Sequence, residues 1–326
     1  MKKIAIVIPK GAVMPSGVIS AYFLLSEANA FKAASGMEPP FEIQLLGYEP
    51  ESKLYDGFVS IQAHGTFEDA APGTFDLVLI PGFTTDMDIP LKLNQPLIAW
   101  LSSQHGHGKT ELASICTGAF ILAATGAAEG KQMTTHWAFE QDFRRRYPRV
   151  KLMPEKIVTD DQGIYASGGA YSALNLLLYL IEKFCDSETA LWLSKVFQID
   201  MGRASQKPFV IFNLQKMHTD DSVAKVQAHI EQHFDQPLIV TELATQFAFS
   251  RRNFIRRFKE ATGNTPIEYI QRVRIEAAKR LLESTAKSVE EIIFSCGYND
   301  GKAFRDIFRK LTGFTPLVYR DKYGRR

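Results

Sequence analysis

The stretch FKEATGNTPIEY, residues 258–269, returns fifty residues later as FRKLTGFTPLVY, residues 308–319. Both copies share a phenylalanine, a Thr-Gly pair, a Thr-Pro pair and a tyrosine at the same spacing. Glycine readily adopts the left-handed conformation that ends a helix, and threonine before proline is a common helix start. Each copy therefore predicts a helix, a tight turn and another helix, and the repeat defines a structural unit that occurs twice.

A short helical segment is expected before each copy. In the first unit we expect Thr241 to cap ELATQFA and Ser250 to cap RRNFIRRFKEAT. In the second unit we expect Ser288 to cap VEEIIFSCG, and Asn299 or Asp300 to start GKAFRDIFRKLT. Two short helices joined by a tight turn form a helix-turn-helix, so the sequence predicts two of them.

The second helix of each unit has an apolar face and a basic one. Phe254 and Phe258, like Phe304 and Phe308, are four residues apart and should face a core. Basic residues fall largely on the other faces: Arg251, Arg252, Arg256, Lys302 and Arg305. One such face is as consistent with a solvated surface as with a binding surface. Two in tandem, connected by one long helix over 266–284, favour a pair of elements that enter successive major grooves of DNA.

Charge is distributed unevenly along the 326 residues. Residues 221–326 carry 19 Lys and Arg against 13 Asp and Glu, whereas the first 220 residues carry 19 against 23. A basic third after an acidic part indicates a polyanionic partner. No apolar run is long enough for a membrane span, and three distant cysteines predict neither disulfides nor a zinc site. We expect a cytoplasmic protein without metal, cofactor or membrane partner.

The first two hundred residues alternate between strands and helices. Apolar runs at 3–8, 41–47 and 75–82 predict buried strands, and helical spacing occurs at 18–31 and roughly 90–103. The alternation predicts an α/β, doubly wound parallel sheet with helices on both faces. Ligands bind such sheets beyond the carboxyl ends of the strands.

A cysteine lies at one of these strand ends, in ASICTGAFIL, residues 113–122. The pattern is typical of a strand-to-helix elbow that presents a nucleophile. Cys116 would then need a lowered pKa and a partner such as His136. The alternative is a buried or pocket-lining thiol. The segments around Phe83 and Gly169 should meet the same edge of the sheet.

The motifs SICTGAFILAATG, MTTHWAFEQDFRRRYP and IYASGGAYSALNLLLYLIE resemble the PfpI-like, class I glutamine amidotransferase-like domain found at the front of AraC-type regulators. The resemblance implies a flavodoxin-like sheet. The sequence departs from the family's enzymes, because Thr117 replaces a histidine after Cys116 and the Ser16-Gly17 region replaces an acidic residue. These departures favour a catalytically degenerate domain, not an enzyme. We expect it to bind a small molecule with these residues: Phe83, Cys116, Thr117, His136 and Gly169.

Residues 222–323 resemble the AraC/XylS-type DNA-binding domain, in ELATQFAFSRRNFIRRFKEATGNTPIEY, RIEAAKRLL and the segment from Ser288 to Arg320. The resemblance implies that Arg252, Ile255 and Arg256 of the first unit enter the major groove. In the second unit it implies the same of Gly301, Lys302 and Arg305. Arg251 lies beside the first set.

The sequence thus predicts a sensor domain over 1–200, a linker over 201–221 and a DNA-binding domain over 222–326. We expect a ligand-responsive transcriptional regulator that binds double-stranded promoter DNA and forms a homodimer. The resemblance suggests an amino acid or quaternary amine as effector, and RNA polymerase as partner if the protein activates. Two alternatives stay open: a PfpI-like cysteine hydrolase or lyase with a DNA-targeting tail, and a front domain that only dimerises.

Overall fold

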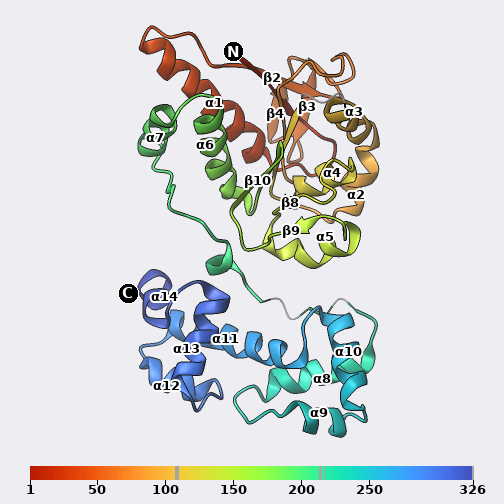
Figure 1. Cartoon of the computed structure of the whole chain (residues 1–326), viewed down its shortest axis with the longest axis vertical. Coiled ribbons are helices and arrows are strands. Elements are labelled where there is room, and N and C mark those ends of the chain that lie inside the picture. Colours follow the sequence, from red (N-terminus) through yellow and green to blue (C-terminus); the bar gives the residue numbers. More distant parts are fainter. Residues whose placement is uncertain (107–109, 213–214, 217, 325–326) are drawn as a thin grey trace. The chain divides into compact units, whose positions relative to one another are not determined.

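The computed structural model describes residues 1–106, 110–212, 215–216 and 218–324. The chain divides into two compact units, Met1–Gln206 and Lys207–Arg326 (Figure 1). The segment expected to be a linker, 201–221, is therefore shared between the units. Among the described residues, no helix is both long and apolar enough to span a bilayer.

The first unit is built on a seven-stranded sheet. Its strands, in spatial order, are β10 (Val158–Asp161), β11 (Ile164–Ser167), β7 (Glu111–Ile115), β6 (Leu77–Ile80), β1 (Lys2–Val7), β2 (Phe41–Gly47) and β5 (Gly65–Thr66). All neighbours are parallel except β10 and β11. β6, β7 and the part of β1 after Lys3 are almost wholly buried because helices cover both faces. The predicted α/β doubly wound parallel sheet is confirmed.

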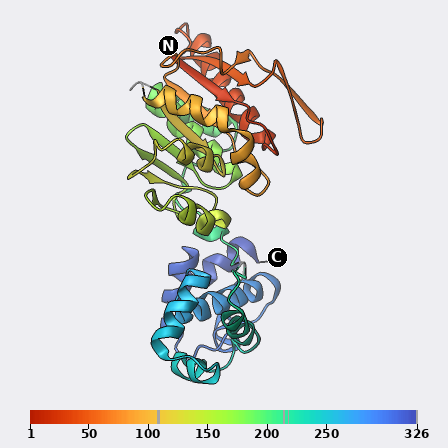
Figure 2. The same cartoon turned by 90° about the vertical axis from the view of Figure 1, so that its right-hand side faces the viewer.

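Helices cover the two faces of this sheet in separate sets (Figure 1). One set packs together and comprises α1 (Pro15–Ala34), α6 (Ala173–Phe184) and α7 (Ser187–Val196). The other set comprises α2 (Asp88–Leu93), α3 (Gln95–Gly106) and α4 (Gly118–Ala124). α5 (Glu140–Arg146), β8 (Gln132–Met133) and β9 (Lys151–Leu152) follow α4 in the chain. Figure 2 shows the hairpin of β3 (Glu51–Leu54) and β4 (Val59–Gln62), in orange, projecting from the unit.

The predicted strands 3–8, 41–47 and 75–82 correspond to β1, β2 and β6. The helical spacing predicted at roughly 90–103 corresponds to two helices, α2 and α3, which Asn94 separates. Its buried side-chain amide donates to the carbonyl oxygens of Lys10 and Pro90, each at 2.8 Å, and accepts from the Lys10 amide at 2.8 Å. This long-range contact has no signature in the local periodicity.

The second unit contains seven α-helices in the described part of the chain. They are α8 (Asp221–Gln232), α9 (Val240–Gln246), α10 (Arg251–Thr262), α11 (Pro266–Ser284), α12 (Val289–Ser295), α13 (Gly301–Thr312) and α14 (Pro316–Tyr323). Two hydrophobic clusters form around α11: its first half packs with α8–α10 and its second half with α12–α14. Tyr269 and Val273 belong to the first cluster, and Ala278 and Leu282 to the second. The predicted long connecting helix is confirmed.

Most predicted helix ends are confirmed. The side chains of Ser250, Thr265, Ser288, Asp300 and Thr315 all accept hydrogen bonds from backbone amides in the first turns of their helices. The glycines after the Thr-Gly pairs, residues 263 and 313, adopt φ of 71° and 80°. The predicted cap at Thr241 is wrong, since α9 begins at Val240 and the extended residue before it makes no side-chain cap.

A strap of irregular chain, Lys207–Phe212, packs on the second unit. It begins with a 3-10 turn, η3 (Lys207–Phe209), that contacts α13. Lys279 Nζ then donates to the Val210 carbonyl at 2.7 Å, and the Phe212 amide donates to Glu276 Oε2 at 3.3 Å. Only 7% of the Lys279 side chain and 12% of the Glu276 side chain are exposed, and they pair at 2.8 Å. A buried ion pair thus holds the backbone at Val210 and Phe212, which lie outside the helices.

Candidate functional site

The elbow of the first unit lies between β7 and α4. Cys116 occupies the turn with φ of 56°, a left-handed conformation that is costly for a residue with a Cβ. Its neighbours are small where the turn demands it. A Cβ on Gly118 would lie 2.5 Å from the Pro81 oxygen, and one on Gly82 would lie 3.0 Å from Cys116 Cβ. The sequence therefore builds the strained elbow that its pattern predicted.

The Cys116 thiol is placed in the interior, since the residue is only 2% exposed. Burial raises its pKa to about 11, and the hydrogen bonds from Thr117 lower it only in part. The Cys116 amide donates to the Ser167 carbonyl at 3.0 Å, and its carbonyl accepts from Thr135 Oγ1 at 3.0 Å. At neutral pH this group is a thiol and not the thiolate that a nucleophile requires.

Phe83 and Thr117 bind each other beneath the elbow. Thr117 Oγ1 accepts from the Phe83 amide at 2.6 Å and donates to the Phe83 carbonyl at 2.9 Å. Both residues are buried. His136 lies half-buried against Gly169, where an added Cβ would approach its Cδ2 to 3.5 Å. Burial lowers the His136 pKa, and its Nδ1 accepts from the Ala138 amide at 3.1 Å.

No acidic residue stands in the first turn of α1. The turn contains Ser16 and Gly17, and a Cβ on Gly17 would lie 3.3 Å from Pro81 Cβ. A side chain at position 17 would therefore be tightly packed against Pro81, and the close approach of these two segments favours a glycine.

Gln206 is a residue at this edge that sequence reasoning missed. Its side-chain amide is buried, and Nε2 lies within 3.1 Å of four oxygens: Thr134 Oγ1 and the carbonyls of Thr135, Pro154 and Lys156. The Gly169 amide donates to its Oε1 at 3.1 Å. A Cβ on Gly168 would fall 2.1 Å from Gln206 Cδ. A glutamine in a polar stretch carries no sequence signal for such burial.

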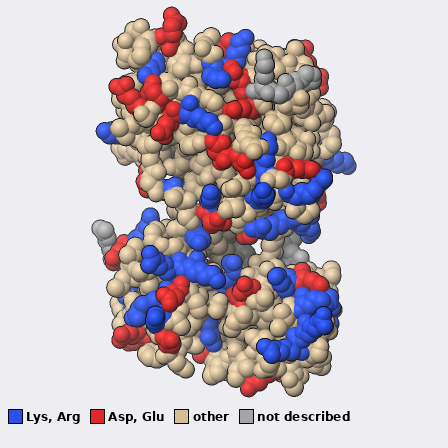
Figure 3. All heavy atoms as spheres, in the orientation of Figure 1, with Lys and Arg blue, Asp and Glu red and all other residues tan. Residues whose placement is uncertain are grey.

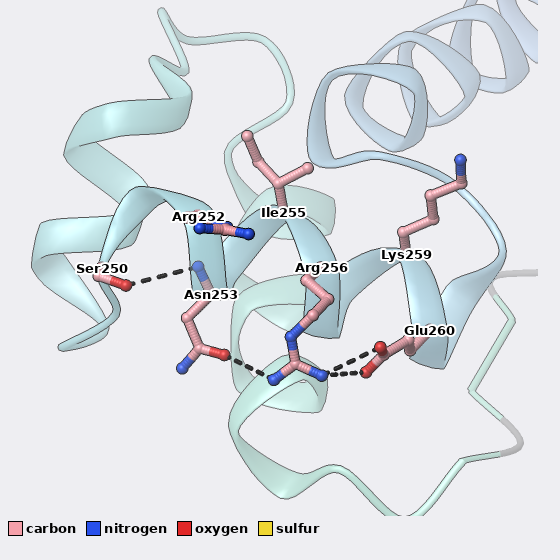
Figure 4. Close-up of a pocket in the computed structure, with 7 residues that line it drawn as sticks. All are labelled: Ser250, Arg252, Asn253, Ile255, Arg256, Lys259 and Glu260. Atoms are coloured by element: carbon pink, nitrogen blue, oxygen red, sulfur yellow. Dashed lines mark hydrogen bonds and ion pairs between the residues drawn. The ribbon is translucent and has the colours of Figure 1, made fainter.

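The second candidate site is the outer face of α10. Phe254 and Phe258 are fully buried with ring centroids 5.5 Å apart, as their spacing predicted. The side chains of Arg251, Arg252 and Arg256 are exposed on the same helix. A hollow on this face is lined by residues from one helix and its cap: Ser250, Arg252, Asn253, Ile255, Arg256, Lys259 and Glu260 (Figure 4).

The corresponding face of α13 is also basic. Phe304 and Phe308 are fully buried, while Lys302 and Arg305 are exposed. A Cβ on Gly301 would lie 3.2 Å from Arg305 Nη1, so the small residue leaves this guanidinium its space. Figure 3 shows Lys and Arg gathered on the second unit, over the position of α10 among others.

A tyrosine completes each core. The Tyr269 ring packs edge-on to Phe258 and its hydroxyl donates to Glu231 at 2.8 Å. The Tyr319 ring packs likewise on Phe308. Its hydroxyl donates to Glu283 at 2.6 Å. The two helix-turn-helix repeats are thus built alike, and in both the basic face points away from the core.

Known protein families match both compact units of the chain. The DJ-1/PfpI family model matches residues 34–183, and a helix-turn-helix domain model matches residues 243–322. The chain is 26% identical to the HTH-type transcriptional regulator CdhR of Pseudomonas aeruginosa over 302 residues, covering 92% of this chain and 86% of the relative. It is 27% identical to the HTH-type transcriptional regulator ArgR of the same organism, covering 70% and 69%.

Solved structures match the first unit's fold. A crystal structure of a transcriptional regulator protein from Vibrio parahaemolyticus superposes with a TM-score of 0.51 at 23% identity. The match covers 60% of this chain and 98% of that one.

Proposed function

We propose that this chain reads promoter DNA with both α10 and α13. The chain joins a DJ-1/PfpI-family domain to an AraC-type helix-turn-helix domain and is a DNA-binding transcriptional regulator. The observation that carries the proposal is that two similar helix-turn-helix repeats pack on one helix, α11. Each buries its phenylalanine pair and presents exposed basic side chains. A major groove is wide enough for such a helix.

The proposed contacts divide between base edges and phosphates. Arg252, Ile255 and Arg256 of α10 enter one major groove, with Ile255 suited to a thymine methyl group. Gly301, Lys302 and Arg305 of α13 enter the next. Arg251 lies in the first turn of α10, where a cation can contact the backbone. Arg257 is only partly exposed where it pairs with Asp220 at 2.7 Å, and the low exposure makes it a less available contact.

For the front domain we propose a sensor of a small molecule, such as an amino acid or quaternary amine, that also forms the homodimer. Phe83, Cys116 and Gly169 follow the carboxyl ends of β6, β7 and β11, where this class of sheet binds ligands. Thr117 and His136 lie beside them. Ligand would act by binding one state better than another, since only differential affinity shifts a population. We place the protein in the cytoplasm, with RNA polymerase as partner if it activates.

The relatives that the chain matches carry the names of transcriptional regulators. We propose in addition that the elbow performs no catalysis. The support is the neutral thiol of Cys116 and the absence of an acidic residue in the first turn of α1.

Alkylation kinetics test this second proposal. With a pKa of about 11, the rate of Cys116 modification by iodoacetamide should still be rising between pH 8 and pH 10, because the thiolate fraction grows tenfold per pH unit below the pKa. Mass spectrometry locates the modified cysteine, and Cys116→Ser identifies its signal. A rate that levels off below pH 7 would show an activated nucleophile and revive the hydrolase or lyase alternative.

The DNA-binding proposal is tested by selection from a library of double-stranded oligonucleotides with a randomised core. The full chain should enrich a bipartite site with two parts about one helical turn apart. Arg252→Ala with Arg256→Ala should erase one part, and Lys302→Ala with Arg305→Ala the other. Loss of both parts with either pair would contradict independent readout by α10 and α13. A thermal-shift screen of the full chain against amino acids and methylated amines tests the sensor.

A further inference from the structure

Helix α10 carries a linked group of side chains along its outer face: Asn253, Arg256 and Glu260. Arg256 Nη1 lies 3.0 and 2.8 Å from the two carboxylate oxygens of Glu260. Arg256 Nη2 donates to Asn253 Oδ1 at 3.0 Å. The guanidinium is therefore held at both ends by neighbours three and four residues away on its own helix (Figure 4).

These contacts leave part of the guanidinium available. Nη2 carries two N–H groups and donates one of them to Asn253, and the N–H on Nε takes no part in the contacts. The guanidinium has five N–H groups in one plane, and the three contacts use at most three of them, so at least two remain as donors. Two planar donors can meet the O6 and N7 acceptors of guanine in the major groove.

Folding stability does not explain why this group exists. The side chains of Arg256 and Glu260 are 59% and 60% exposed, and exposed pairs contribute little to stability. A carboxylate on the face that meets DNA also repels phosphates. The pair instead orients the guanidinium before DNA binds. A free arginine side chain would lose rotamer freedom on binding, and that loss costs binding free energy.

We propose that Glu260 and Asn253 are positioning residues that make Arg256 select guanine in the major groove of duplex DNA. Held between them, the guanidinium presents its remaining N–H groups to a base edge and is kept from turning to the nearest phosphate. This inference rests on the proposed function, since it takes α10 as a reading helix. It adds a specificity-determining role for two residues that do not themselves read a base.

The second helix-turn-helix lacks this arrangement. Fifty residues on, the positions of Asn253, Arg256 and Glu260 hold alanine, aspartate and lysine, residues 303, 306 and 310. The reading cation there, Arg305, stands one position earlier. The supported guanidinium is thus a property of α10 alone, and its removal should affect one part of the DNA site.

The test repeats the randomised-library selection with Glu260→Ala, Asn253→Ala, Arg256→Ala and Arg256→Lys in the full chain. Wild type should enrich a guanine that Arg256→Ala no longer selects. Glu260→Ala should lower the preference for that guanine about fivefold or more, the low end of what a bidentate base contact discriminates. It should also bind random DNA more tightly, with a salt slope steeper by about 1. Arg256→Lys should weaken the guanine preference but keep the salt slope, because an ammonium keeps the charge and lacks the planar donors of a guanidinium.

Glu38→Ala is the control, since it also removes an exposed carboxylate, here from a loop of the first unit. It should leave the base preference unchanged. If Glu260→Ala keeps the wild-type base preference at every position, the inference is overturned. It is also overturned if Glu260→Ala changes a cytosine preference and retains the guanine, because Glu260 would then itself read a base. If wild type enriches a site but no guanine depends on Arg256, the inference fails and the proposed function stands. If wild type enriches nothing, both fail.

Discussion

The two helix-turn-helix units share their construction and differ in their outer faces. Each has a side-chain cap, a buried phenylalanine pair, a left-handed glycine and a tyrosine that donates to a glutamate. Yet Arg256 and Glu260 of α10 correspond to an aspartate and a lysine in α13. Packing in the core restricts the residue types at the inner positions, whereas the exposed outer positions can differ without loss of folding stability. A repeated scaffold can therefore read two different DNA sequences.

The largest expected effect comes from breaking the shared scaffold. Phe258→Ala and Phe308→Ala each remove a fully buried ring, which costs about 3–5 kcal/mol of unfolding free energy. Because α11 contributes to both clusters, either change should unfold the whole second unit in one transition. All three tryptophans lie in the first unit, at positions 100, 137 and 192. The urea midpoint of unfolding followed by far-UV circular dichroism should thus fall, whereas the midpoint followed by tryptophan fluorescence should not.

The number of unfolding steps in the two variants shows whether the two halves fold together. If Phe308→Ala melts its own half and leaves the α8–α10 half folded, the circular dichroism curve gains a second step. The two helix-turn-helix halves would then fold independently, and α11 would be a spacer instead of a shared core element.

The next effect concerns the strap that touches both halves. Lys279→Met leaves the Glu276 carboxylate buried without its cation, and breaking such a pair costs about 3 kcal/mol. Glu276→Gln combined with Lys279→Met removes both charges and should recover most of the loss. Urea titration followed by circular dichroism measures both variants. Equal loss in the single and double variants would mean that the buried charge is not the cause.

Much of this comparison could be predicted from the sequence, and the missed parts share one reason. The repeat, its caps and its buried phenylalanines depend on residues a few positions apart, so local patterns report them. Gln206, Asn94 and the Glu276–Lys279 pair depend on partners far along the chain. On a helix, a glutamate three residues before a lysine has the usual pattern of a solvated surface. Only the packed strap shows that these two charges are buried.

The candidate sites show the same division. The residue types of the elbow were predictable, since a cysteine and glycines mark a tight strand-to-helix turn. The mutual hydrogen bonds of Thr117 and Phe83 were not, because they join segments 34 residues apart. In α10 the i, i+4 spacing of Arg256 and Glu260 was visible in the sequence, but the choice between pairing and free side chains needed coordinates.

The smallest expected effect distinguishes the two caps. Asp300 accepts from two amides, Lys302 at 2.8 Å and Ala303 at 3.2 Å, whereas Ser250 accepts from the Asn253 amide at 3.4 Å. A carboxylate also interacts favourably with the positive end of a helix. Asp300→Ala should therefore lower the unfolding free energy by about 1–2 kcal/mol and Ser250→Ala by about 0.5–1 kcal/mol, within the range known for caps.

Asp300→Asn separates the two contributions of the second cap. Asparagine keeps the side-chain oxygen that accepts the amides but carries no charge, so the loss should be smaller than for Asp300→Ala and should shrink further in high salt. Circular dichroism in urea at two salt concentrations measures both. If Ser250→Ala proves the costlier change, hydrogen-bond length is not what ranks the caps. The difference between the units would then lie in how tightly each first turn packs on its core.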